Sequence, residues 1–276
     1  MKVPFTKMHG TGNDFIVIDC RNFRLADPAA FSVKFCHRKF GVGADQMLLL
    51  YPSEIGDFAM KIFNADGSEV EMCGNGIRCF AKYVWDRNLS GKKVLEVETL
   101  AGMIRPEKSG NNVRVDMGEP ILAPDKIPVA VYSEAMAVDY PLIVEDRNFK
   151  LTFVSMGNPH AVIFLEEEVS GFAVDKYGPL IETHALFPKK TNVEFVNVKS
   201  RDELIMRVWE RGSGETLACG TGACATAVAA MIKGLTEKHV IVKLLGGDLS
   251  IEWSENNRVY MTGPAVEVFE GVVNYD

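Results

Sequence analysis

Two short stretches of the chain, EMCGNGIRCF (residues 71–80) and LACGTGACAT (residues 217–226), share one plan. Each has a cysteine, Cys73 or Cys219, directly before Gly-x-Gly, and each then continues into residues typical of a helix. The first turn of a helix carries unpaired N–H groups and the positive end of the helix dipole, and glycine lets a ligand approach that backbone closely. The sequence therefore predicts two helices that begin just after a cysteine.

The two stretches occupy matching places in an internal repeat. When the sequence is shifted against itself by about 145 residues, many polar and glycine positions coincide. The coinciding positions are Asn13 and Asn158, Gln46 and Asn192, Asn64 and Glu210, Cys73-Gly74 and Cys219-Gly220, and Gly102 and Gly247. Chance rarely keeps one offset across so many such positions, so two copies of one supersecondary plan are the simplest interpretation.

The repeat predicts two domains. The second copy begins in the segment GEPILAPDKIP (118–128), whose prolines suit an extended connector. The expected domains are residues 1–117 and residues 118–262. We expect a final strand from residues 263–276 to cross back and complete the first domain, because both copies are followed by similar segments.

Runs of β-branched and apolar residues bounded by Gly, Asp or Pro predict strands. They are residues 14–19, 46–51, 58–63 and 93–99 in the first copy, and 161–165, 193–198, 204–210 and 239–245 in the second. Helices are fewer. Strands that surround one buried helix, twice over, indicate an α+β fold with two pseudo-symmetric domains rather than alternating βαβ units.

One predicted helix lies outside the cysteine stretches, in DPAAFSVKFCHRKFG (27–41). Asp27 suits the N-cap, Pro28 suits the first helical position, and Gly41 suits the end, so Cys36 is expected inside this helix. The helix after Cys219 continues as GACATAVAAMIKG (222–234), which is apolar on nearly every side. A helix without a polar face is expected at the centre of its domain.

Composition narrows the class of partner. The chain has 276 residues, 47% of them hydrophobic, and a net charge of −7 with scattered Lys and Arg. We therefore expect a small-molecule partner, with no nucleic acid and no membrane. The N-terminal sequence lacks the layout of a secretory signal, which favours a cytoplasmic protein. Its six cysteines lack the spacing of zinc ligands, so no metal site is expected.

The paired cysteines indicate a particular chemistry. A helix N-terminus favours the thiolate, so we expect the cysteine pKa values to lie below the usual value of about 8.5. The N–H groups of Gly74, Asn75, Gly220 and Thr221 are placed to hold a carboxylate. Two thiols that approach one carbon from opposite sides can remove a proton from one face and return a proton to the other.

Each of these residues also has a structural interpretation. A single cysteine before a helix is more often a small buried hydrophobe, but two at equivalent places in a repeat favour catalysis. Cys20, Cys36, Cys79 and Cys224 are expected to be packing residues. A single asparagine usually serves a turn, and Glu210-Arg211 could form a solvated ion pair. The recurrence of these residues in the repeat favours a polar cleft instead, in which Glu210 and Arg211 bind an ammonium and a carboxylate. His160 is either a core histidine or an accessory to the thiols.

The longer motifs resemble a known family. They are KMHGTGNDF (7–15), GADQ (43–46), FNADGSEVEMCGNGIRCF (63–80), SMGNPHAV (155–162), TNVEFV (191–196), VWERGSGETLACGTGACA (208–225) and YMTGPA (260–265). Together they are similar to diaminopimelate epimerase, an isomerase of lysine and peptidoglycan-precursor synthesis, and the similarity runs through nearly the whole chain.

The resemblance implies more than the residues alone show. It implies two domains, each a β-barrel or roll around a central helix, with the active site in the cleft between them, and a homodimer. It implies interconversion of LL- and meso-2,6-diaminopimelate without pyridoxal phosphate or metal, with Cys73 and Cys219 as alternating base and acid. The implied substrate-binding residues are Asn13, Gln46, Asn64, Gly74, Asn75, Asn158, Asn192, Glu210, Arg211, Gly220 and Thr221, with His160 as an accessory residue.

Two other functions stay open at the level of sequence. A proline racemase or hydroxyproline epimerase would use the same paired thiols on a smaller cyclic substrate, although the many polar residues for a distal end argue against it. A non-catalytic amino-acid binding protein or a thiol redox protein is the alternative from another class. Redox pairs more often lie close in sequence as C-x-x-C, which the chain lacks.

Overall fold

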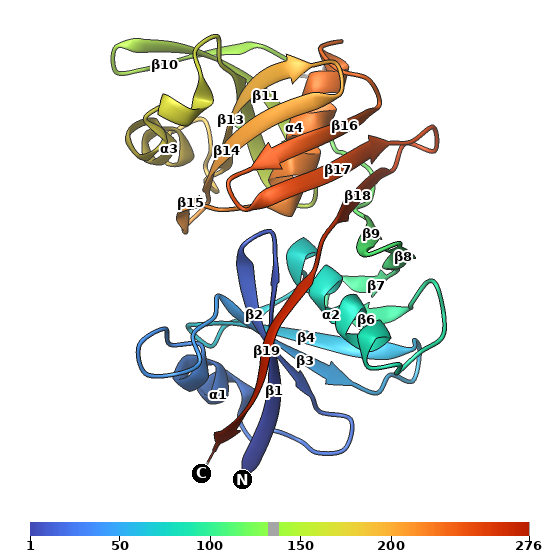
Figure 1. The fold of residues 1–276 in the computed structure, drawn as a ribbon. Coiled ribbons are helices and arrows are strands. Elements are labelled where there is room, and N and C mark those ends of the chain that lie inside the picture. Colours follow the sequence, from blue (N-terminus) through green and yellow to red (C-terminus); the bar gives the residue numbers. More distant parts are fainter. Residues whose placement is uncertain (132–137, 276) are drawn as a thin grey trace. The chain divides into compact units, whose positions relative to one another are not determined.

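The computed structural model describes residues 1–131 and 138–275, and the chain divides into two compact units (Figure 1). The first unit comprises Met1–Asp116 and Thr262–Asp276, and the second comprises Met117–Met261. Both units are rich in sheet and contain few helices. The expected α+β class is therefore confirmed.

The first unit has one sheet with strand order β19-β1-β2-β3-β4-β6-β7, and β5 pairs with β4. The strands are β1 (Lys2–Gly10), β2 (Asn13–Asp19), β3 (Gln46–Tyr51), β4 (Phe58–Asn64), β5 (Glu69–Val70), β6 (Val97–Thr99), β7 (Gly102–Ile104) and β19 (Val266–Asn274). A hairpin of β8 (Glu107–Ser109) and β9 (Asn112–Asp116) also belongs to this unit. Its helices are α1 (Pro28–Phe35) and α2 (Gly74–Asp86).

The second unit has a sheet with strand order β10-β11-β12-β13-β14-β16-β17-β18, and β15 pairs with β14. The strands are β10 (Tyr140–Val144), β11 (Arg147–Ser155), β12 (Pro159–Phe164), β13 (Asn192–Ser200), β14 (Glu203–Glu210), β15 (Gly214–Thr216), β16 (His239–Leu244), β17 (Gly247–Trp253) and β18 (Val259–Gly263). Its helices are α3 (Val174–Glu182) and α4 (Gly220–Ile232), with short 3₁₀ turns η1 (Pro124–Lys126) and η2 (Val169–Gly171).

The two sheets repeat one pairing scheme. In the first unit β1 and β2 are antiparallel, β2 and β3 parallel, β3 and β4 antiparallel, and β4 and β6 parallel. In the second unit β11, β12, β13, β14 and β16 follow the same sequence of directions. In chain order, helix α1 lies between the parallel strands β2 and β3, and helix α3 lies between the parallel strands β12 and β13. The ends of corresponding strands therefore present corresponding side chains.

Each unit encloses a central helix. Helix α4 packs against β11, β12, β13, β14, β16 and β17, and Figure 1 shows β11, β14, β16 and β17 around it. Its interior residues, from Gly222 to Ala230, are all buried, as expected for a helix without a polar face. Helix α2 packs against β1, β2, β3 and β9 and buries Arg78 completely. The Arg78 guanidinium donates to the carbonyl oxygens of Gly74 and Pro264 and to Thr11 Oγ1.

Helix α1 begins as predicted but is shorter than predicted. Asp27 is the N-cap and its side chain accepts the Ala30 N–H at 3.0 Å. The helix ends at Phe35, so the prediction that it continues to Gly41 and contains Cys36 is wrong; Cys36 is the C-cap.

The early end has a local cause. The Phe35 carbonyl accepts the N–H groups of Val42 and Gly43, which turns the chain back on the helix end. His37 Nδ1 accepts the N–H of Lys39 at 3.1 Å, and that donor therefore needs no helical partner. A Cβ atom at Gly41 would lie 2.5 Å from the Phe35 carbonyl oxygen, so only glycine fits this return.

Two further elements differ from the expectation. Of the strand expected at residues 93–99, only Val97–Thr99 is a strand; before it, Val94 forms a single bridge with Glu107. Helix α3 was not predicted, because Gly178 and Pro179 in its middle are typical of a break. Gly178 is needed there because its helix turn lies directly on the Trp209 ring, 2.5 Å from the position a Cβ would take.

The helices of the described residues are all too short or too polar to cross a membrane.

We expect enlargement of a buried alanine in α4 to destabilise the second unit. Ala227 is 0% exposed inside the surrounding strands, so Ala227→Leu has to displace packed side chains and should lower the free energy of unfolding by about 1–3 kcal/mol. Urea denaturation followed by tryptophan fluorescence measures the change. Met231→Leu, at the partly buried end of the same helix, is the matched control and should change it by less than about 1.5 kcal/mol. An unaltered midpoint for Ala227→Leu would contradict the tight packing described here.

Candidate active site

Both cysteines of the repeat cap a central helix with their sulfur. Cys73 and Cys219 are the N-cap residues of α2 and α4 and have extended backbones. The Gly76 N–H donates to Cys73 Sγ at 3.4 Å, and the Gly222 N–H donates to Cys219 Sγ at 3.3 Å. The helices therefore begin where the sequence predicts, and each thiol lies at the positive end of a helix dipole.

The glycine three residues after each cysteine permits this close approach. A Cβ atom on Gly222 would lie 2.8 Å from Glu194 Oε1 and 3.3 Å from Cys219 Sγ. A Cβ atom on Gly76 would lie 3.3 Å from the Cβ of Cys73. The second glycine of the Cys-Gly-x-Gly pattern thus makes room for the sulfur cap.

In the first unit, a tight turn places Asn13 beside Cys73. Thr11 and Gly12 have positive φ values of 51° and 86° in the two-residue turn between β1 and β2, which is the backbone of a type I′ hairpin. The Cys73 thiol and the Asn75 amide both donate to Asn13 Oδ1, at 3.6 and 3.3 Å. Three of the predicted site residues are thereby brought together.

A charged network fixes the other end of the Asn13 amide. Asn13 Nδ2 donates to Asp45 Oδ2 at 2.9 Å, and Arg38 bridges Asp45 and Asp14. Lys7, which is 7% exposed, also pairs with Asp14 at 2.6 Å. Burial raises the pKa of Asp14, but the hydrogen bonds from Arg38 and Lys7 outweigh it and hold that pKa well below its usual range. The network keeps Asn13 Oδ1 turned toward the cysteine.

Gln46 and Asn64 form a second polar pair in the first unit. They lie opposite each other at the ends of β3 and β4, and Gln46 Nε2 donates to Asn64 Oδ1 at 2.8 Å. Gln46 Oε1 and Asn75 Oδ1 are buried without a hydrogen-bond partner among the residues described. Both are acceptors, so a ligand that donates N–H or O–H groups would satisfy them.

In the second unit, a chain of contacts connects Cys219 to a buried carboxyl group. Thr221 Oγ1 lies 3.5 Å from Cys219 Sγ and accepts from Asn158 Nδ2 at 3.3 Å. His160 Nε2 lies 2.9 Å from Asn158 Oδ1, and His160 Nδ1 lies 2.6 Å from Glu194 Oε1. The side chains of His160 and Glu194 are both 0% exposed. His160 is thus a buried, fully hydrogen-bonded histidine connected to the polar residues near Cys219.

Asn192 and Arg211 meet at the ends of β13 and β14. Asn192 is 3% exposed, accepts the Arg211 N–H at 2.9 Å and donates to the Pro159 carbonyl at 2.9 Å. Glu182, at the end of α3, accepts the Gly212 N–H at 3.0 Å and so holds the same turn. The amide of Asn192 therefore connects two backbone segments, and the Arg211 side chain starts from a fixed turn.

The expected lowering of the cysteine pKa is wrong for Cys219. Burial raises its pKa well above the usual value, and the carboxylates of Glu210 and Glu194 raise it further. The hydrogen bonds from Thr221 and from the Gly222 N–H lower it, but by less. Cys219 is 6% exposed, so the loss of water outweighs the helix dipole and the Cys219 thiol is protonated near neutral pH.

Two carboxyl groups of the site were missed by the sequence analysis. Asp45 lies in GADQ beside Gln46, and Glu194 lies in TNVEFV between apolar residues. A charged residue within a buried strand was the available signal for Glu194. Cys20, Cys36, Cys79 and Cys224 are all at most 3% exposed, as expected for packing residues.

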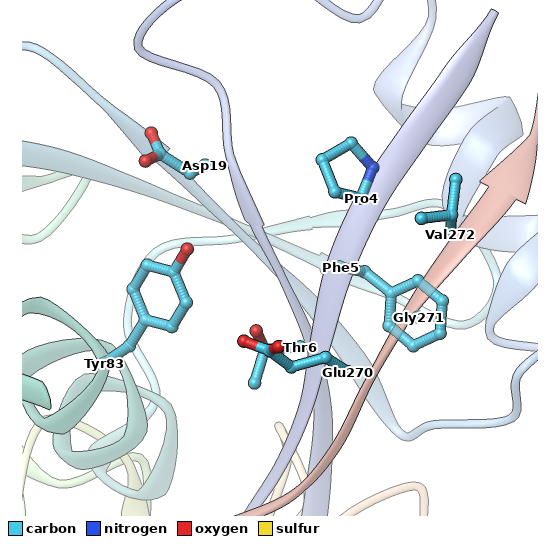
Figure 2. Close-up of a pocket in the computed structure, with 8 residues that line it drawn as sticks. All are labelled: Pro4, Phe5, Thr6, Asp19, Tyr83, Glu270, Gly271 and Val272. Atoms are coloured by element: carbon cyan, nitrogen blue, oxygen red, sulfur yellow. The ribbon is translucent and has the colours of Figure 1, made fainter. Parts of the chain in front are cut away.

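A separate pocket in the first unit lies away from these residues. Figure 2 shows its lining, from Pro4, Phe5, Thr6, Asp19, Tyr83, Glu270, Gly271 and Val272. None of the predicted site residues contributes to it. Asp19 is paired with Arg21 and Glu270 with Arg87, so its carboxylates are already neutralised within the unit.

The fold places the chain in a class of two-domain α+β proteins. A phenazine biosynthesis protein of the PhzF family from Enterococcus faecalis has a similar structure, with a TM-score of 0.74 and 17% identity over 100% of both chains. A probable proline racemase from Agrobacterium radiobacter also has this fold, with a TM-score of 0.69 and 16% identity over 99% of this chain and 93% of that one.

The sequence comparisons identify the family within this class. The profile of diaminopimelate epimerase matches residues 5–123 and 152–268. The diaminopimelate epimerase of Acetivibrio thermocellus is 54% identical over 276 residues, which cover 98% of each chain. The chain belongs to the diaminopimelate epimerase family and is therefore an isomerase, as the sequence motifs indicated.

We expect the raised pKa of Cys219 to be visible in its reactivity. Only the thiolate reacts with iodoacetamide, so Cys219 should be almost unreactive near pH 7 and should react only well above pH 9, at the upper end of the cysteine range. Glu210→Gln removes a negative charge that disfavours the thiolate, so the alkylation rate of Cys219 should begin to rise at a lower pH than in the wild-type protein. Peptide mass spectrometry across a pH series measures both.

Glu215→Gln is the matched control, because Glu215 pairs with Arg207 and does not contribute to the shift at Cys219. It should leave the profile unchanged. A Cys219 that is alkylated near pH 7 as fast as a cysteine in an unfolded peptide would contradict the protonated thiol.

Proposed function

We propose that the chain interconverts LL- and meso-2,6-diaminopimelate, with Cys73 and Cys219 as the two acid–base groups. The observation that carries the proposal is the pair of equivalent helix starts, each capped by a cysteine sulfur with glycine three residues later. A single thiol can remove a proton but cannot return one to the opposite face, whereas two can invert the carbon. The place of such an enzyme is lysine and peptidoglycan-precursor synthesis.

In the proposed reaction one cysteine acts as a thiolate and takes the α-proton. The electron pair of the broken C–H bond stays on the α-carbon and is delocalised into its carboxylate. The other cysteine, as a thiol, gives its proton to the opposite face and becomes the thiolate. The N–H groups of Gly74, Asn75, Gly220 and Thr221 stabilise the negative charge on the carboxylate as it develops. In the free protein the Cys219 thiol is protonated, because burial and two carboxylates raise its pKa.

The polar side chains at the strand ends supply specificity for a long substrate. We assign Asn13, Gln46, Asn64, Asn158, Asn192, Glu210 and Arg211 to this role. The unpartnered acceptors Gln46 Oε1 and Asn75 Oδ1 suit an ammonium donor. A substrate that lacks the second amino-acid end would leave such buried groups unpaired, which penalises it strongly.

The two copies of the repeat are, we infer, the two domains of this enzyme: residues 1–117 with 263–276, and residues 118–262. The compact units Met1–Asp116 with Thr262–Asp276 and Met117–Met261, and their shared scheme of strand directions, support this division.

A hydrogen-exchange assay tests the reaction. Reduced protein is incubated with LL-diaminopimelate in D₂O, without added pyridoxal phosphate or metal, and the α-proton signals are followed by NMR. Loss of an α-proton signal together with appearance of the meso isomer is the expected result. Cys73→Ala and Cys219→Ala should each lower the epimerisation rate by at least about 10³-fold, since either change removes one of two obligatory groups.

Cys20→Ala is the control, because Cys20 is a buried packing residue outside the site, and it should keep the wild-type rate. Full activity in either site variant would refute the two-thiol mechanism. Exchange on L-proline but not on diaminopimelate would indicate a proline racemase. Ligand binding without exchange would indicate a binding protein, and a thiol-dependent redox reaction without exchange would indicate a redox protein.

We also propose a cytoplasmic homodimer. A reducing compartment keeps both catalytic thiols available. Strand β19 is the last strand at one edge of its sheet, and Val266, Val268, Phe269 and Val272 on it are 43–61% exposed. Exposed apolar side chains on an edge strand favour association with a second copy.

A charge on β19 tests the dimer. Val268→Glu places a carboxylate on the edge strand and should shift the sedimentation coefficient from dimer to monomer. Val33→Glu, at a similarly exposed valine on α1, is the control and should stay dimeric. A wild-type protein that sediments as a monomer at all concentrations would contradict the proposal.

A further inference from the structure

The hydrogen bonds around His160 determine where its protons lie. Asn158 Nδ2 donates to Thr221 Oγ1 at 3.3 Å, so the group that faces His160 Nε2 at 2.9 Å is the carbonyl oxygen Oδ1. A carbonyl oxygen can only accept, and Nε2 therefore has to carry a proton. A neutral imidazole protonated on Nδ1 alone would turn a lone pair toward Asn158 Oδ1.

Glu194 contacts the other ring nitrogen of His160, Nδ1. Its Oε1 lies 2.6 Å from His160 Nδ1, so one proton is held between the two atoms. Whether this proton resides on Nδ1 or on the carboxyl group, the pair has no net charge, which suits two side chains that are 0% exposed. In both arrangements Nε2 keeps its proton. Glu194 Oε2 is buried without a hydrogen-bond partner among residues 1–131 and 138–275.

The first unit holds its equivalent asparagine by a comparable device. Asn13 Nδ2 donates to Asp45, and this fixes Oδ1 on the side of Cys73. In the second unit the fixed end is reversed, because Asn158 Oδ1 faces His160 and its NH₂ group faces Thr221. Equivalent asparagines are therefore held with opposite ends toward the start of their helices.

We propose that Glu194 is a positioning residue, which acts through His160 to hold the Asn158 amide with its NH₂ group toward the start of α4. This inference rests on the proposed function, in which Asn158 binds the substrate. An amide NH₂ group has two N–H bonds, and the contact with Thr221 uses one of them. Asn158 thus offers the other N–H to a substrate carboxylate, whereas Asn13 offers an oxygen atom to donors.

The proton position can be measured without substrate. In protein labelled with ¹⁵N-histidine, long-range ¹H–¹⁵N NMR distinguishes a protonated ring nitrogen from one with a lone pair. The spectrum contains five histidines, and comparison with His160→Gln assigns the signals of His160. We expect Nε2 of His160 to be protonated near pH 7.

Two variants of Glu194 test the effect on the reaction. Glu194→Gln keeps a hydrogen-bond partner, because its amide N–H can donate to Nδ1 and leaves the proton on Nε2, so KM should stay within about threefold of wild type. Glu194→Leu removes the partner and lets the ring choose the other tautomer, so KM for diaminopimelate should rise about 10–100-fold while kcat changes less.

A double-variant cycle separates positioning from a general loss of structure. On an Asn158→Ala background, Glu194→Leu should raise KM by less than about threefold, because the amide that it positions is already absent. If Glu194→Leu raised KM by the same factor in the wild-type and Asn158→Ala proteins, the proposal would be overturned. Circular dichroism of each variant establishes that it is folded, and if Glu194→Leu does not fold, Glu194→Ala takes its place in the cycle.

The NMR result decides the inference independently of activity. A lone pair on Nε2 of His160 in the wild-type protein would overturn it, because the Asn158 amide would then face the other way. Wild-type protein that is inert toward diaminopimelate, with Nε2 protonated, would instead overturn the proposed function and with it the role given to Asn158.

Discussion

The sulfur cap at the start of each central helix is the constraint on which the site depends. An N-cap residue normally accepts the N–H of the third helical residue through an oxygen atom, and here a cysteine sulfur does so at 3.3–3.4 Å. The cap fixes the cysteine at the helix end and requires glycine at the third position. The neighbouring N–H groups at the same helix end remain oriented toward the site. The same hydrogen bond therefore caps the helix and positions the cysteine sulfur.

At Cys219, burial and the helix dipole have opposite effects on the pKa of the thiol. For Cys219 the loss of water and the nearby carboxylates of Glu210 and Glu194 raise the pKa more than the helix end lowers it. A thiol that is protonated at rest and surrounded by oriented donors can give up its proton only when the local charge changes. A substrate ammonium near Glu210 would be such a change, since it offsets a negative charge. Under the proposed function, the arrival of the substrate would therefore favour the Cys219 thiolate.

Much of this structure could be predicted from the sequence, and the predictions that were wrong or missing have physical causes. The helix starts after Cys73 and Cys219 follow from local glycine patterns and were predicted. Helix α3 was missed because its Gly178 and Pro179 are poor helix formers, and only its packing on Trp209 makes them acceptable. The internal repeat did indicate a helix at the position of α3, because α1 occupies the matching place in the first copy. The pKa of Cys219 could not be predicted, because its largest cause is burial by strands that are distant in the chain, and Glu194, which adds to the effect, is 25 residues away.

The return of the chain to its first unit affects the order in which the protein can fold during synthesis. Strand β1 is made before the other strands described here, yet one of its edges pairs with β19, which is made after all of them. Arg78 in α2 likewise donates to the Pro264 carbonyl oxygen, on the same returning segment. Met117–Met261 is continuous and can fold in between. Strand β1 therefore has one edge unpaired until β19 has been made, and an unpaired strand edge of this kind can associate with another chain.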